Sequence, residues 1–131
     1  RLQHQVIPGM HEMSVCLNLL EMIGRIAAED GATRVASVEV SIGPLSGVEP
    51  GLLARAFEAA RRGTVAETAR LDVEATGIVV SCAECGRLTE ASLTMLTCGH
   101  CGNGQTEIRS GRELFLKSVE LDIPEAVEQG V

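Results

Sequence analysis

The sequence predicts an α+β fold in which two helices pack on a small three-stranded sheet and a cysteine-rich module is inserted between two of the strands. Two stretches show the 3.6-residue apolar repeat of helices, and three show the two-residue alternation of half-buried strands. Four of the five cysteines form two close pairs within one short segment. A length of 131 residues suits one main core and one small additional module.

The first nine residues show neither a helical nor a strand repeat and end in Pro8-Gly9, a turn signal. We therefore expect residues 1–9 to be an N-terminal extension, either a leader or a cloning remnant. The sequence does not begin with methionine, and Met10 offers a second start.

The first helix is expected over residues 13–28, where the apolar positions form two neighbouring stripes and hence a broad buried face. Asp30-Gly31 ends it, because glycine accommodates the left-handed conformation past a helix C-terminus. Cys16 lies on the buried face, so we expect a small core residue and not a metal ligand. The two stripes are Met13, Cys16, Leu17, Leu20, Ile23 and Ala27, and Val15, Leu19, Met22 and Ile26.

A strand and a second helix follow. Val38, Val40 and Ile42 alternate with polar residues, which is typical of a strand with one buried face. The helix is expected to begin at Pro50, which suits a first helical turn, with Glu49 at or near its N-cap. Its core side is formed by Leu53, Ala56, Phe57 and Ala60.

The last two strands flank the cysteine module. One alternates from Leu71 to Ala75 and continues through residues 78–80 into Cys82. The other covers residues 114–123, and its phase changes near Lys117-Ser118, which indicates a bulge. The predicted organisation is an extension at 1–9, an α/β domain at 10–80 and 106–124, a cysteine module at 81–105 and an acidic tail at 125–131.

The cysteine module has the spacing C-x2-C-x12-C-x2-C. Four thiolates so spaced can converge on one tetrahedral metal, and the segment has too few large apolar residues to fold on a core of its own. We therefore predict a zinc-ribbon-like domain folded by a structural Zn²⁺. Gly86 and Gly102 follow the two pairs, where a tight turn often needs positive φ. The predicted ligands are Cys82, Cys85, Cys98 and Cys101.

Two alternatives to zinc remain open for these cysteines. A thiol redox role fits less well, because a redox C-x-x-C normally occurs once and at the start of a helix. Iron is not separated from zinc by four thiolate ligands. An electron carrier usually packs aromatic residues around such a site, and none lies between Cys82 and Cys101.

Charge and motifs argue against several function classes. A formal net charge of −7 and only two aromatic residues disfavour nucleic-acid binding. No apolar run approaches the roughly 18 residues of a membrane span, and the paired thiols favour a reducing compartment, the cytoplasm. The sequence has no G-x-S-x-G, P-loop or HExxH motif, so we expect no enzymatic activity.

A second candidate metal site is His11-Glu12, just before the first helix. Imidazole together with a deprotonated backbone nitrogen favours square-planar nickel or copper. An exposed His-Glu pair is more often solvated surface, however, and Glu12 equally suits a helix N-terminus. The residues alone leave both interpretations open.

Three motifs in order resemble the HypA/HybF family, the nickel metallochaperones of nickel-iron hydrogenase maturation. They are Met10-His11-Glu12-Met13-Ser14, the stretch V-S-I-G-P-L-S-G-V-E-P over residues 40–50, and the two C-x-x-C pairs ahead of a final strand. The likeness extends from Met10 to about Pro124. It implies two helices on a small mixed sheet that carries an inserted zinc domain.

The resemblance also implies a nickel site. The family holds nickel at the Met-His-Glu start through the terminal amine and the backbone and ring nitrogens of the histidine, which is His11 here. Glu12 matches a position that supports nickel binding or partner docking, and Glu49 matches an acidic residue that can reach the nickel. Met10 completes this set, but residues 1–9 place its amine in a peptide bond. His11, Glu12 and His4 then remain as candidate ligands, while the four cysteines match the family's zinc ligands.

The function implied is that of a non-enzymatic carrier. It would deliver Ni(II) to a hydrogenase large subunit together with a nickel-handling GTPase, as a monomer or weak homodimer in the cytoplasm. A competing hypothesis is a zinc-ribbon protein-interaction module without metal delivery.

Overall fold

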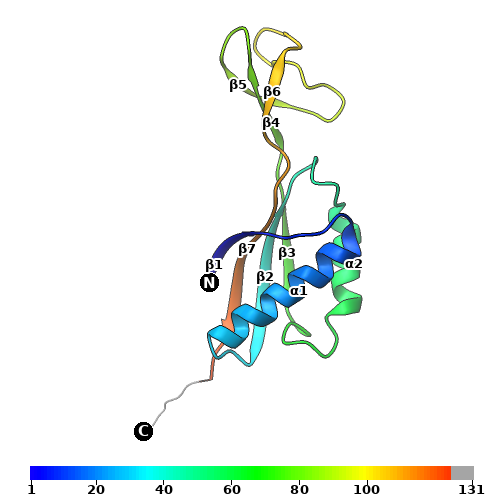
Figure 1. Ribbon diagram of the computed structural model, residues 1–131, viewed down its shortest axis with the longest axis vertical. Helices are drawn as coiled ribbons and strands as arrows, with labels where there is room; N and C mark the ends of the chain where they lie inside the picture. Colours follow the sequence, from blue (N-terminus) through cyan, green and yellow to red (C-terminus); the bar gives the residue numbers. More distant parts are fainter. Residues whose placement is uncertain (125–131) are drawn as a thin grey trace.

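A computed structural model describes residues 1–124 and confirms the predicted α+β class. Two helices, α1 (Glu12–Glu29) and α2 (Pro50–Ala60), pack on the larger of two sheets (Figure 1). This sheet is mixed, because β2 runs parallel to β3 and antiparallel to β7. Its strand order is β1 (Leu2–Val6), β7 (Leu114–Asp122), β2 (Arg34–Ile42) and β3 (Arg70–Ala75).

A smaller three-stranded sheet carries the cysteine pairs and stands at one end of the molecule (Figure 1). It consists of β5 (Leu88–Ala91), β4 (Ile78–Cys82) and β6 (Thr106–Ser110), and its neighbouring strands are antiparallel. The smaller sheet begins before and ends after the cysteine module predicted at residues 81–105, because β4 starts at Ile78 and β6 ends at Ser110.

The expectation of one continuous strand from Leu71 into Cys82 was wrong. The segment forms two strands that belong to different sheets, β3 in the larger and β4 in the smaller. Residues on both sides of Thr76-Gly77 alternate between more and less buried positions, as in a single strand. The sequence pattern therefore does not indicate that the chain passes from one sheet to the other.

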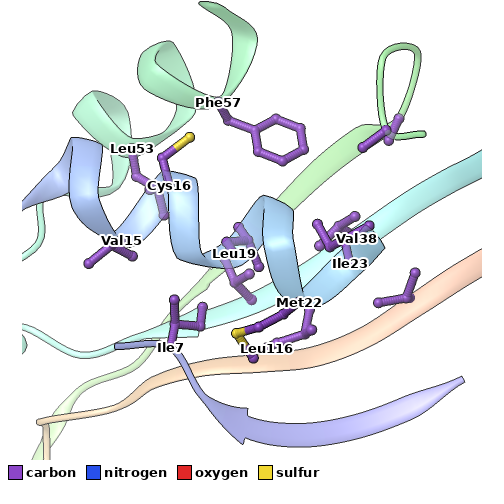
Figure 2. Close-up of a cluster of buried hydrophobic side chains, with 14 of the residues drawn as sticks. Ile7, Val15, Cys16, Leu19, Met22, Ile23, Val38, Leu53, Phe57 and Leu116 are labelled. Atoms are coloured by element: carbon purple, nitrogen blue, oxygen red, sulfur yellow. The ribbon is translucent and has the colours of Figure 1, made fainter. Parts of the chain in front are cut away.

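Residues 1–9 do contain a strand, contrary to the sequence-based expectation, and the larger sheet has four strands instead of three. β1 pairs antiparallel with β7, and the backbone N–H of Ile7 donates to the carbonyl of Leu114 at 2.9 Å. Ile7 is only 1% exposed and lies near Met22 and Leu116 in the core (Figure 2). The strand lacks a clean two-residue repeat because its register shifts around His4, whose φ is +64°.

The core lies between the helices and the larger sheet. From α2, Leu53 and Phe57 point into it (Figure 2). Met13 and Leu17 were expected on the buried face but are 45% and 54% exposed, because the core takes only the other side of the helix. Cys16 is fully buried and is a core residue as predicted. The buried residues of α1 are Val15, Cys16, Leu19, Met22, Ile23, Ile26 and Ala27.

Several local predictions are confirmed. Gly31 has a φ of +69° just past α1, and Pro50 is the first residue of α2. Ser118 pairs with Glu39 and Leu116 with Val40, so Lys117 is the extra residue of a bulge in β7. The predicted acidic tail at 125–131 lies outside the described residues. Within residues 1–124, neither helix combines the length and apolar character that crossing a membrane requires.

Candidate metal centres

The four paired cysteines converge at one end of the smaller sheet. Their sulfur atoms all lie within 4.8 Å of one another. The Sγ atoms of Cys82 and Cys101 are 3.5 Å apart, and those of Cys85 and Cys98 are 3.7 Å apart. Tetrahedral Zn–S bonds of about 2.3 Å require S···S separations of about 3.8 Å. The thiols therefore stand at the spacing that a four-thiolate metal site needs.

Two tight turns hold the sulfurs in place. The Sγ of Cys82 accepts from the backbone N–H groups two and three residues downstream, both at 3.4 Å, and Cys98 repeats the pattern at 3.3 and 3.4 Å. Gly86 and Gly102 close the turns with φ values of +72° and +79°, which confirms the expected positive φ. The two halves of the site thus have the same local geometry.

The backbone amides shift the pKa values of the thiols. Hydrogen bonds from the amides of Cys101 and His100 lower the pKa of Cys98 to about 6, against the opposing effect of burial. The amide of Cys85 likewise lowers the pKa of Cys82. The first cysteine of each pair therefore favours the thiolate form, the form that binds metal.

The second candidate site lies where α1 begins. His11 is the N-cap residue in an extended conformation, and the Met10 side chain is 88% exposed. The backbone N–H groups of Met10 and His11 both donate to the Ser14 hydroxyl, at 3.2 and 3.3 Å. That hydroxyl donates in turn to the His11 carbonyl at 3.0 Å. Sequence reasoning missed this role of Ser14, although the third position of a helix is a known capping position.

The structure brings the predicted site residues Glu12 and Glu49 into contact. The Oε2 of Glu12 accepts from the backbone N–H of Glu49 at 2.9 Å. This bond lowers the pKa of Glu12. Glu49 is the N-cap of α2, as predicted, and its own Oε2 accepts from the N–H of Gly51 at 2.6 Å. The two helix N-termini are thus joined through Glu12.

A pocket of about 440 Å³ is lined by Glu12 and Glu49 among other residues. Its wall is mainly apolar and includes the end of β2, the loop over residues 43–49 and the end of β3. Thr76 and Gly43 belong to this wall, and sequence patterns gave no indication of them.

The remaining predicted nickel residues do not form a closed ligand set. Within residues 1–124, the four cysteines are the only group in which three or more histidine, cysteine or acidic side chains converge. Glu12 and Glu49 meet, His11 precedes Glu12 with an exposed side chain, and His4 lies on β1. The described residues therefore form one compact sulfur cluster, whereas the predicted nickel residues stay spread over the starts of α1 and α2 and over β1.

A four-thiol module on an α/β domain whose helix start is open and polar defines a small metal-binding protein. The family model described as "Hydrogenase/urease nickel incorporation, metallochaperone, hypA" matches residues 10–121. The chain therefore belongs to the HypA family of nickel-incorporation metallochaperones, which are not enzymes.

Curated relatives and solved structures agree with this assignment. The chain is 45% identical over 114 residues to the hydrogenase maturation factor HypA of Aquifex aeolicus. The matched region covers 87% of this chain and 99% of the relative. It is 43% identical over 112 residues to that of Nitrosospira multiformis, at 86% and 97% coverage. The solution structure of the Ni metallochaperone HypA from Helicobacter pylori matches with a TM-score of 0.63 and 28% identity, over 88% of this chain and 100% of the other.

Proposed function

We propose that the chain carries Ni(II) at the N-terminus of α1 and delivers it to the large subunit of a nickel-iron hydrogenase, with a nickel-handling GTPase as a partner. The main support is the 2.9 Å hydrogen bond between Glu12 and the Glu49 amide. It brings the carboxylate of Glu12, the residue after His11, to the backbone of Glu49 from a separate part of the chain. Imidazole nitrogen and carboxylate oxygen are suitable ligands for a divalent transition metal.

The proposed nickel site would comprise His11, Glu12, Glu49 and the backbone of Met10. Its exposure favours release of nickel by ligand exchange, because incoming ligands can reach the metal from solvent. The positive end of the α1 dipole opposes a cation at this position, and the two carboxylates offset that effect. Nickel would thus be bound but remain exchangeable.

We further propose that the four cysteines hold a structural Zn²⁺. The S···S separations of 3.5 and 3.7 Å fit tetrahedral thiolate ligation. In the smaller sheet and its loops only Ile78, Val80, Cys82 and Cys98 are buried apolar residues, so a metal would contribute much of the folding free energy. Free thiols of this kind also fit a cytoplasmic location.

Nickel transfer tests the delivery step. The zinc-loaded chain carrying ⁶³Ni would be mixed with a metal-free hydrogenase large subunit and the GTPase, and the radioactivity bound to the large subunit measured over time. With a chelator present in both reactions, we expect nickel to reach the large subunit faster from this chain than from the same amount of nickel added as a free salt. Equal rates would contradict delivery by this chain.

The alternative function, a zinc-ribbon interaction module without metal delivery, has one supporting observation. Leu88, Leu93 and Met95 on the smaller sheet and its loop are 64%, 60% and 64% exposed, which is typical of a protein contact surface. A module of this kind would bind a partner and zinc but would take up no nickel. Nickel stoichiometry therefore separates the two functions.

A further inference from the structure

Two short segments join the smaller sheet to the larger one. Thr76-Gly77 connects β3 to β4, and residues 111–113 connect β6 to β7, which gives the narrow neck visible in Figure 1. Two such linkers would normally allow one part to swing against the other. In this chain, however, hydrogen bonds connect the two linkers to each other and to the segment after β2.

The side chain of Glu113 bonds to both linkers. Its Oε1 accepts from the backbone N–H of Gly111 at 2.8 Å and from the hydroxyl of Thr76 at 3.1 Å. One carboxylate oxygen therefore ties together the two segments that enter and leave the smaller sheet. Arg112, its neighbour, is exposed and forms no ion pair within residues 1–124.

The same linkers are bonded to the segment that follows β2. The N–H of Gly43 donates to the carbonyl of Glu113 at 2.8 Å, and the N–H of Leu45 donates to that of Gly111 at 2.7 Å. The N–H of Thr76 donates to the carbonyl of Ile42 at 2.9 Å. Three stretches of backbone that are distant in sequence thus meet at Glu113.

The backbone segments at this junction are in close contact at Gly43. A Cβ atom on Gly43 would lie 2.3 Å from the carbonyl oxygen of Gly111 and 2.6 Å from the Oε1 of Glu113. Only glycine allows so close a backbone approach. The segment after β2 and the second linker therefore cannot slide past each other without breaking these contacts.

This junction also forms part of the pocket beside the nickel residues. Gly43 and Thr76 line that pocket together with Glu12 and Glu49. The loop that begins at Gly43 ends at Glu49, whose amide binds the Glu12 carboxylate. Glu113 thus lies at one end of a short, hydrogen-bonded loop, and the contact between Glu12 and Glu49 lies at the other.

We propose that Glu113 is a positioning residue that pins the four-cysteine module to the loop over residues 43–49, so that module and α/β domain tumble as one body and Glu49 is held in place. The orientation part stands on the neck contacts alone. The effect on Glu49 as a nickel residue rests on the proposed function.

The test compares three variants of the zinc-loaded full chain. Glu113→Ala removes the acceptor, Glu113→Gln retains an Oε1 that can accept both bonds, and Arg112→Ala is a matched control at the next position. Thr76→Val, which removes one donor and preserves shape, serves if Glu113→Ala does not fold. Residual dipolar couplings of backbone amides report whether one alignment tensor fits both sheets.

We expect one common tensor for wild type, Arg112→Ala and Glu113→Gln, and loss of the common tensor in Glu113→Ala or Thr76→Val. A common tensor in Glu113→Ala, or in Thr76→Val where Glu113→Ala does not fold, would overturn the proposal, and so would separate tensors in wild type. In nickel titrations, Glu113→Ala should bind about 10-fold more weakly and Glu113→Gln like wild type. If wild type binds no nickel, the proposed function fails, while the dipolar couplings still decide the role of Glu113.

Discussion

The Oε2 atom of Glu12 lies 2.9 Å from the backbone nitrogen of Glu49, so one carboxylate at the start of α1 caps the chain just before α2. The contact connects the N-termini of two helices between which the strand β2 lies in the sequence. It also gives Glu12 two roles, as a structural hydrogen-bond acceptor and as a candidate nickel ligand. The ionised form of the carboxylate favours both roles, because it is the stronger acceptor and the form that binds a cation.

Acid should weaken the contact between Glu12 and Glu49. The pKa of Glu12 lies below its ordinary value of 4.5 in the folded chain, chiefly because of the Glu49 amide. A lowered folded-state pKa adds stability above the unfolded-state pKa, and this stability is lost as the pH falls through the folded-state value. Urea unfolding followed by circular dichroism at 222 nm measures this from pH 7 to pH 3.

The matched variant for this experiment is Glu12→Gln, which keeps an acceptor oxygen but does not titrate. The advantage of wild type over Glu12→Gln should stay constant above about pH 4.5 and shrink below it. Loss of zinc at acid pH affects both proteins alike and cancels in the comparison. An advantage that is unchanged down to pH 3 would contradict the assigned role of the carboxylate.

A chain that starts at Met10 should bind nickel more tightly than the chain with residues 1–9. Its free amine adds a nitrogen ligand that the peptide bond now withholds. Isothermal titration calorimetry would compare the two, with acetylation of the Met10 amine expected to cancel the gain. Ile7→Ala in the full chain controls for packing lost with β1, which for a buried isoleucine costs about 2–5 kcal/mol. Equal affinities for the two chains would refute the amine as a ligand.

Cys16→Ser should destabilise the α/β domain and leave the metal content unchanged. Cys16 is fully buried among apolar side chains of α1 and α2, and burial raises the pKa of its thiol (Figure 2). An unpaired hydroxyl in that position costs about 1–3 kcal/mol. Thermal unfolding measures the loss and atomic absorption the zinc. A drop in zinc per chain would show instead that Cys16 belongs to the metal site.

Removal of zinc by a chelator should unfold the smaller sheet and spare the larger one. The core cluster contains residues from both helices and the larger sheet, and none from residues 78–110. Amide NMR signals of β4, β5 and β6 should therefore lose dispersion while those of α1 and β2 persist. Cys98→Ala should give the same spectrum without a chelator. A smaller sheet that stays folded in both cases would refute a structural role for the metal.

Local features of the fold could be predicted from the sequence because neighbouring residues determine them. The cap at Glu49, the bulge at Lys117 and the glycines after each cysteine pair all depend on a few adjacent positions. The strand at residues 2–6 could not be predicted, since it owes its conformation to the free edge of β7 and to the buried site that Ile7 fills.

The candidate sites differ in the same way. Cysteine spacing alone indicated that four thiols would converge, because metal geometry restricts that spacing. The contact between Glu12 and Glu49 and the neck around Glu113 join residues far apart in the chain. No local pattern encodes such contacts, and only the family resemblance pointed to Glu49 as part of the nickel site.

Nickel titration of wild type and His11→Ala by calorimetry tests the central claim most directly. We expect one nickel per wild-type chain and at least about 10-fold weaker binding by His11→Ala, with one zinc per chain retained in both. His100→Ala, which removes an exposed histidine beside the cysteines, should bind nickel like wild type. Equal nickel binding by wild type and His11→Ala, or none by either, would contradict the account.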